Sequence, residues 1–214
     1  MQILVLSLSL FQSNCILIWD EKTLAGVVFD PGGEPEKVLS AIETRKIQLK
    51  GIFLTHGHVD HVAGAQKIKE KTGAKVYLNE EDKPLAEGIG RQCLMFGVPM
   101  APVPVVDSWV KEGDTCTFDA LKFKVLHMPG HSPGSVVYQF EEPEALLVAG
   151  DLLFAGSIGR MDLPGGNEEQ MKKSLERVLT LPDSLVVIPG HGPKTTIGKE
   201  KRQNPYLVGG MAGW

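Results

Sequence analysis

Four ionisable side chains follow directly behind an apolar run in the segment IFLTHGHVDHVAGA (residues 52–65). His56, His58, Asp60 and His61 lie within six consecutive positions of this segment. Imidazole nitrogens and carboxylate oxygens are the ligands that divalent transition metals take from proteins. The spacing therefore predicts metal chemistry, although Asp60 taken alone could also be the N-cap of the helix that follows.

Three further segments place a donor in an equivalent position. His131 lies in PGHSPGS (129–135), Asp151 ends AGD (149–151), and His191 lies in PGHGP (189–193). Each donor comes just after an apolar, strand-like segment and directly after a glycine, which permits a sharp turn or a close approach. If these strands end at one edge, the side chains converge.

The number of donors indicates two metal ions. The four segments supply five imidazoles and two carboxylates, which is too many for one tetrahedral ion. Two ions with three ligands each, sharing one bridging carboxylate, would use all seven. His131 and His191 could individually be ordinary turn histidines, but together with the HxHxDH motif they favour a dinuclear site. His127 lies inside a strand-like segment, and we expect a hydrogen-bonded structural role for it.

The segments around these donors predict an α/β fold. Residues 1–29 read as an antiparallel meander of strands, the first of them with one fully buried face. Helices are expected at 34–46, at 61–73 with Gly73 as the end, weakly at 80–96, and at 167–181 with Asn167 as N-cap. Further strands are expected at 50–55, 74–79, 116–128, 135–140, 145–150 and 185–190, and a proline-rich loop at 97–106.

Composition limits the partners. A formal charge of −4 and a pI near 5.9 argue against nucleic acid as partner. The isolated Cys15, Cys93 and Cys116 indicate neither a disulfide framework nor a thiolate metal site. The apolar opening MQILVLSLSLF lacks a basic start and a cleavage site, so we expect a strand there, not a signal peptide or a membrane span. We expect a cytoplasmic protein that acts on a small molecule.

The motifs THGHVDH, PGHSPGS, AGD and PGHGP, in this order along essentially the whole chain, resemble the metallo-β-lactamase fold and especially its glyoxalase II-like hydrolases. The resemblance implies a single domain over residues 1–214. It also implies a four-layer αββα sandwich of two mixed sheets flanked by helices. By the same resemblance, one metal is held by His56, His58 and His131, the other by Asp60, His61 and His191, and Asp151 bridges the two.

The same resemblance predicts a metal-dependent hydrolase. Two divalent ions are implied, with zinc expected first and iron or manganese left open, and a hydroxide between them would be the nucleophile. Asp60 would orient this hydroxide or relay its proton. A thiol with a pKa of about 8.5 leaves readily as thiolate, so a thioester such as S-lactoylglutathione is the expected substrate. Asp30 is expected to support the site without binding metal.

Substrate contacts are less defined. Arg160, in GSIGRMDLPGG (156–166), could grip a substrate carboxylate or simply pair with Asp162. Full-length glyoxalase II carries a C-terminal helical domain that recognises glutathione, whereas only 23 residues follow His191, so we expect no such domain. A basic stretch here could contact a carboxylate or form a solvated face; it contains Lys194, Lys199, Lys201 and Arg202.

Other functions stay open at this point. A mononuclear iron persulfide dioxygenase of the same fold carries a similar pattern, and a lactonase would use the same hydrolytic chemistry. A nucleic-acid phosphodiesterase is disfavoured by the acidic charge. A non-enzymatic binding module is disfavoured by the seven donors. The oligomeric state is not predicted by the sequence.

Overall fold

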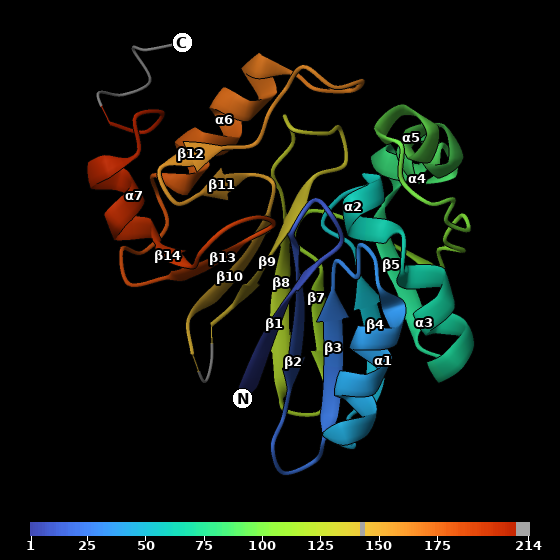
Figure 1. Ribbon diagram of the computed structural model, residues 1–214. Coiled ribbons are helices and arrows are strands. Elements are labelled where there is room, and N and C mark those ends of the chain that lie inside the picture. Colours follow the sequence, from blue (N-terminus) through green and yellow to red (C-terminus); the bar gives the residue numbers. More distant parts are fainter. Residues whose placement is uncertain (142–143, 209–214) are drawn as a thin grey trace.

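The computed structural model describes residues 1–141 and 144–208 and contains two six-stranded sheets (Figure 1). In the first sheet, strands β1 to β3 pair antiparallel, as the opening meander predicts, and β3 to β6 pair parallel. This sheet has the strand order β1 (Gln2–Leu8), β2 (Ser13–Trp19), β3 (Ala25–Phe29), β4 (Gln48–Phe53), β5 (Lys75–Asn79) and β6 (Ser108–Val110).

The second sheet is mixed as well. Its strand order is β14 (Thr195–Thr196), β13 (Val186–Pro189), β10 (Leu146–Gly150), β9 (Val136–Phe140), β8 (Leu121–His127) and β7 (Thr115–Phe118). β10 and β13 are parallel, and β9 is antiparallel to both β8 and β10. Strands β8, β10 and β13 therefore run in one direction. A two-stranded hairpin, which the sequence pattern did not predict, follows as β11 (Leu153–Phe154) and β12 (Ser157–Ile158).

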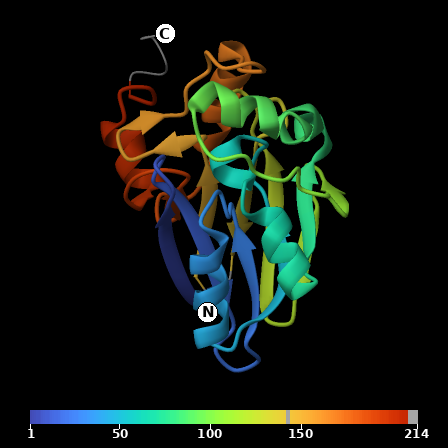
Figure 2. The ribbon, with the colours of Figure 1, turned by 45° about the vertical axis from the view of Figure 1, so that its right-hand side comes forward.

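Helices cover the outer face of each sheet (Figures 1 and 2). Those over the first sheet are α1 (Pro35–Thr44), α2 (Val59–Val62), α3 (Ala65–Thr72), α4 (Lys83–Glu87) and α5 (Ile89–Phe96), with a 3₁₀ turn at Glu80–Asp82. Those over the second are α6 (Glu168–Val178) and α7 (Ile197–Gln203). The predicted four-layer αββα sandwich is confirmed. Within the described residues, no helix combines the length and the apolar character that a membrane crossing requires.

Strand alternation divides the core into three layers. Successive side chains point to opposite faces, so Phe29 packs between the sheets while Val28 packs under the helices. The layer between the sheets is rich in aromatic rings: the Phe29 ring centroid lies 5.1 Å from that of Tyr138 and 5.5 Å from that of Phe123. These contacts hold the two sheets face to face.

Two sequence predictions need correction. The first strand was expected to bury one face fully, but in β1 only Leu8 is buried, because β1 is the edge strand of its sheet. The helix expected at 61–73 is divided into α2 and α3 at Gly64, whose N–H donates to the Pro31 carbonyl at 2.7 Å. Its end at Gly73, with φ of 73°, agrees with the prediction, as does Asn167 as N-cap of α6.

The sheet directions bring distant segments to one edge. β4 in the first sheet and β8, β10 and β13 in the second all end near α2, at the upper end of the sandwich in Figure 1. Five of the seven donors identified in the sequence lie in the connections that follow these four strands, and the other two, Asp60 and His61, lie in the short helix α2 directly after the β4 connection. Irregular backbone at one edge of a rigid scaffold is where functional side chains concentrate in layered folds.

Candidate metal centre

Three histidines form a first group of donors, called here the first triad: His56, His58 and His131. One ring nitrogen from each lies within 4.8 Å of the other two. The closest approach joins His58 Nδ1 and His131 Nε2 at 2.9 Å. All three side chains are buried. Three buried imidazoles facing one point form the type of ligand set that zinc and iron accept.

A second group, the second triad, consists of Asp60, His61 and His191, and its ligand atoms also lie within 4.8 Å of one another. Asp60 Oδ2 lies 3.1 Å from His191 Nε2 and 3.4 Å from His61 Nε2. His61 is fully buried, whereas the His191 side chain is 28% exposed, so this triad is open to solvent on one side.

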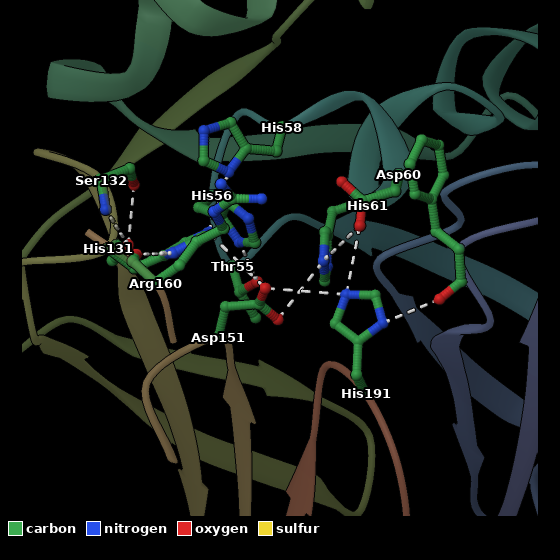
Figure 3. A network of polar contacts seen from close by, with 12 residues as sticks. Thr55, His56, His58, Asp60, His61, His131, Ser132, Asp151, Arg160 and His191 are labelled. Carbon is green, nitrogen blue, oxygen red and sulfur yellow. Dashed lines mark hydrogen bonds and ion pairs between the residues drawn. The ribbon is translucent and has the colours of Figure 1, made fainter. Parts of the chain in front are cut away.

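Asp151 lies between the two triads, as Figure 3 shows. Its Oδ1 is 3.4 Å from His61 Nε2, and its Oδ2 is 3.5 Å from His131 Nε2 and 3.6 Å from His191 Nε2. A single carboxylate thus contacts ligand atoms of both groups. The structure brings all seven predicted donors together, with Asp151 between the two triads.

Backbone carbonyls orient two of the imidazoles. His131 Nδ1 lies 2.7 Å from the Arg160 carbonyl oxygen, and His191 Nδ1 lies 3.1 Å from that of Phe11. A carbonyl oxygen only accepts, so each Nδ1 must carry the proton. The Nε2 atom of each ring therefore faces the centre. This pattern is typical of metal-binding histidines, whose second nitrogen is fixed by an outer partner.

Asp30 and Thr55 orient two more rings. Asp30 accepts hydrogen bonds from the Thr55 N–H at 2.7 Å and from the Thr55 hydroxyl at 2.6 Å, and it lies 3.0 Å from His61 Nδ1. Because the Thr55 hydroxyl proton is directed at Asp30, its oxygen accepts from His56 Nδ1 at 3.0 Å. In both rings Nδ1 is thereby held by an outer partner, and Nε2 faces inward. Through its side chain, Asp30 thus contacts the Thr55 N–H, the Thr55 hydroxyl and the His61 ring.

Three of the inward atoms have no hydrogen-bond partner among the described residues. Of the four buried side-chain atoms without a partner among the described residues, three belong to the donors, namely His56 Nε2, His61 Nε2 and Asp151 Oδ1, and the fourth is Ser13 Oγ. Buried polar atoms are otherwise almost always paired, because desolvation without compensation costs about 1–3 kcal/mol each. Three such atoms aimed at one point indicate that a cation completes them.

Burial and charge act differently on the two triads. Burial and the neighbouring imidazoles lower the pKa of His56 well below its usual value and lower that of His58 to about 3. Burial also acts to lower the pKa of His61, but the carboxylates of Asp60, Asp151 and Asp30 outweigh it and raise the pKa well above 6.5. His56 and His58 are therefore neutral at pH 7, whereas the carboxylates around His61 favour a proton or a cation at that ring.

Glycine at two positions lets the backbone approach the centre. A Cβ atom on Gly190 would lie 2.1 Å from Asp151 Oδ1 and 2.8 Å from His61 Cε1. Gly150 has φ of 50°, and a Cβ there would lie 2.4 Å from Thr55 Oγ1. A side chain at either position would collide with the site, which agrees with the close approach expected of a glycine before a donor.

A buried carboxylate that the sequence analysis did not identify supports the HxHxDH loop. Asp82 accepts from the Gly57 N–H at 2.7 Å, the Ser132 hydroxyl at 2.7 Å and the Gly134 N–H at 2.6 Å. These bonds connect the loop carrying His56 and His58 to the loop carrying His131. Asp82 lies in an otherwise helical, charged segment, and nothing in its local sequence distinguishes it from a solvent-facing acid.

Comparison with known proteins agrees with this geometry. The sequence model described as the metallo-beta-lactamase superfamily matches residues 8–191. The chain belongs to the metallo-beta-lactamase superfamily. It is 41% identical over 210 residues to hydroxyacylglutathione hydrolase GloC of Haemophilus influenzae, covering 97% of this chain and 98% of that protein.

Two solved structures are similar to this member of the superfamily along nearly its whole length. BLEG-1 B3 metallo-beta-lactamase superposes with a TM-score of 0.90 at 32% identity and covers 97% of this chain and 100% of its own. TTHA1623, solved in a di-iron-bound form, superposes with a TM-score of 0.86 at 40% identity and covers 95% and 100%. Members of the metallo-beta-lactamase superfamily are metal-dependent hydrolases that bind divalent ions, and the cluster described above fits such a site.

A cavity of about 350 Å³ lies over the centre of this superfamily member. Its wall includes Phe11, Phe96, Phe154 and Leu163 beside the donors. Arg160 lines it too, but its guanidinium makes two hydrogen bonds of 2.6 Å to Asp162. Of the two roles considered for Arg160, the structure contains the pairing with Asp162. The Arg160 backbone carbonyl orients His131, and the sequence did not predict this role.

The remaining candidates lie outside the cavity. His127 Nε2 donates to the Pro133 carbonyl at 2.8 Å, which confirms the expected hydrogen-bonded histidine. Lys201 contacts Asp183 at 2.7 Å, and Arg202 contacts the same carboxylate at 4.0 Å. None of the four basic residues from the 194–202 stretch lines the cavity, and this arrangement favours a solvated face.

Proposed function

We propose that this protein is a dinuclear metal-dependent hydrolase that cleaves a thioester of the S-lactoylglutathione type. One observation carries the proposal: two complete triads share one edge of the sandwich, and a single carboxylate, Asp151, contacts both. A mononuclear iron enzyme would need only one triad. The geometry therefore favours two ions over the single-iron dioxygenase alternative.

The proposed residue roles follow from the donor set. The first triad would hold one ion, the second triad the other, and Asp151 would hold both. Two divalent ions held there would lower the pKa of bound water toward about 7 and would stabilise negative charge on a carbonyl oxygen. Asp60 lines the cavity with its Oδ2 3.1 Å from His191 Nε2, and in this proposal it would orient a water molecule or relay its proton.

The thioester substrate is supported by chemistry and by likeness. A thiolate leaves without a protonating acid. Among the described residues the cavity offers no obvious acid, because apart from the donors its wall is mainly apolar and its one cation, Arg160, is paired with Asp162. The relative named hydroxyacylglutathione hydrolase GloC matches over nearly the full length of both chains. We propose zinc as the native metal because imidazole and carboxylate ligands suit it, with iron and manganese as the measured alternatives.

The test is thiol release by protein loaded separately with zinc, iron or manganese. We expect hydrolysis of S-lactoylglutathione that depends on two ions per chain, and loss of both activity and one or more ions in His58→Ala and Asp151→Ala. His127→Ala is the matched control, because it removes a hydrogen-bonded histidine outside the cluster. Full activity in metal-free protein would refute the proposal. One iron per chain with oxygen uptake would instead establish the dioxygenase, and turnover of lactones or β-lactams alone would reassign the substrate.

We also propose a reducing, cytoplasmic location. All three cysteines are free thiols, and Cys15 and Cys93 are buried. Burial raises the pKa of the Cys116 thiol to about 11, which keeps it protonated and unreactive. Fractionation of cells that produce the protein, with thiol counting under non-reducing conditions, tests this location.

A further inference from the structure

A second hollow of about 270 Å³ adjoins the cavity over the metal centre. The two share His58, Phe96 and Leu163 in their walls, so a molecule with its reacting group at the centre can extend from one into the other. The wall of the second hollow is mainly apolar; besides the shared residues it contains Pro84, Leu85, Gly88, Arg91, Gln92, Met95 and Pro164.

Helix α5 forms one side of this hollow and is fastened to the HxHxDH loop by Gln92. The Gln92 side chain accepts from the Val59 N–H at 2.9 Å and donates to the carbonyls of Gly57 at 3.2 Å and Leu85 at 2.9 Å. Two of these bonds join the side chain to the residues on either side of His58, and they fix the distance between α5 and the metal centre. Whatever α5 presents to the hollow is therefore held in a constant position relative to the donors.

Arg91, next to Gln92 on α5, is the only basic side chain in the wall of the second hollow. It is exposed, and within residues 1–141 and 144–208 it makes no ion pair and no side-chain hydrogen bond. Glu87 lies four residues earlier, but its carboxylate contacts Lys83 at 3.9 Å. Arg160, the cation of the first cavity, is already bound to Asp162. Arg91 is thus the cation along this groove that remains available to a ligand.

We propose that Arg91 binds a carboxylate on the non-reacting arm of the substrate, and that this arm lies in the second hollow. The proposal rests on the hydrolase function proposed above and narrows its substrate class. The substrate is a thioester with one amphipathic arm whose apolar stem packs on Leu85, Met95 and Phe96 and whose anionic end reaches Arg91. A guanidinium forms two parallel bonds to a carboxylate, so it selects such an arm by geometry as well as charge.

Three thioester series test the assignment: one with a carboxylate on the thiol arm, one with a carboxylate on the acyl arm, and one with neither. For Arg91→Gln we expect kcat/KM for one charged series to fall about tenfold relative to the uncharged series, the size of one partly exposed charge-assisted hydrogen bond. Arg91→Lys keeps the positive charge but loses the planar guanidinium with its paired N–H donors. Its ratio of kcat/KM for the charged series to that for the uncharged series should lie between those of the wild type and Arg91→Gln. The charged series whose kcat/KM falls in Arg91→Gln identifies the arm that Arg91 binds.

Lys22→Gln is the matched control, because it removes one positive charge from the hairpin between β2 and β3 at the other end of the sheet. It should leave the ratio unchanged. An unchanged ratio in Arg91→Gln, or an equal fall in all three series, would overturn the proposal.

A direct binding measurement separates this proposal from the hydrolase assignment. Calorimetric titration needs no turnover and uses two pairs of ligands: a thiol with a carboxylate on its arm against its uncharged amide, and an acyl product with a carboxylate on its arm against the amide of that carboxylate. We expect the wild-type protein to prefer the carboxylate form and Arg91→Gln to lose about tenfold of that preference. If no thioester is hydrolysed but this preference is found, the hydrolase proposal fails and the Arg91 site stands. If thioesters are hydrolysed but this preference is absent, the hydrolase proposal stands and the Arg91 site fails.

Discussion

Replacing Gly190 by alanine should dismantle the metal centre while the fold survives. The new Cβ would lie 2.1 Å from Asp151 Oδ1, whereas Cβ atoms essentially never approach another atom within 3.0 Å. The Asp151 carboxylate must therefore move by about 0.9 Å, and His61 Cε1, at 2.8 Å, must move as well. A displacement of about 1 Å in a catalytic group costs roughly 100-fold in rate. We expect kcat/KM to fall by about this factor and metal occupancy to fall below two ions per chain.

Gly192→Ala provides the matched control two residues away. Gly192 has φ of 76° and no atom within 4 Å of a new Cβ, so alanine there meets backbone strain of about 1–2 kcal/mol but no contact with the site. It should lower the melting temperature by a few degrees and keep both ions. Elemental analysis and thermal unfolding of the two variants give the comparison. A Gly190→Ala protein with two ions and wild-type activity would refute the reasoning.

Three further outcomes are expected. Asp30→Asn removes an acceptor from His61 Nδ1 and should weaken metal affinity by about 10–100-fold in a chelator competition; unchanged affinity would contradict the supporting role. The pKa of His61 is raised, so an ion must displace a proton there, whereas the pKa of His58 is about 3 and needs no such exchange. As pH falls toward about 5, the ion of the second triad should leave first, giving a one-ion plateau in metal content; simultaneous loss of both ions would count against it. Phe29→Ala should cost about 3–5 kcal/mol of unfolding free energy in urea, because Phe29 packs between the sheets; a cost under about 1 kcal/mol would show that the aromatic layer is not what holds them.

The fold was predictable because its signals are local. Phe29 and Val28 alternate between two buried layers, and this alternation leaves a strand pattern in the sequence. Gly73 with a positive φ and Asn167 as a cap are also local devices. The exposure of β1 was not predictable, because whether a strand lies at the edge of a sheet depends on pairing with distant strands.

The donors were identifiable from the sequence, but most of what orients them was not. A histidine after a strand and a glycine is a visible pattern, and the convergence follows from strands ending at one edge. The Phe11 and Arg160 carbonyls that orient His191 and His131 belong to the backbone, which carries no residue signal. Gln92 and Asp82 act through contacts 25 to 52 positions away in the chain, and such contacts form only when the helices are packed.

The most direct test of the dinuclear centre is a crystal structure of the metal-loaded protein with anomalous scattering recorded at the metal edge. We expect two peaks per chain, one about 2.0–2.3 Å from the ligand atoms of His56, His58 and His131 and the other at that distance from Asp60, His61 and His191, with Asp151 contacting both. A single peak, or two peaks held by other residues, would contradict the proposed centre.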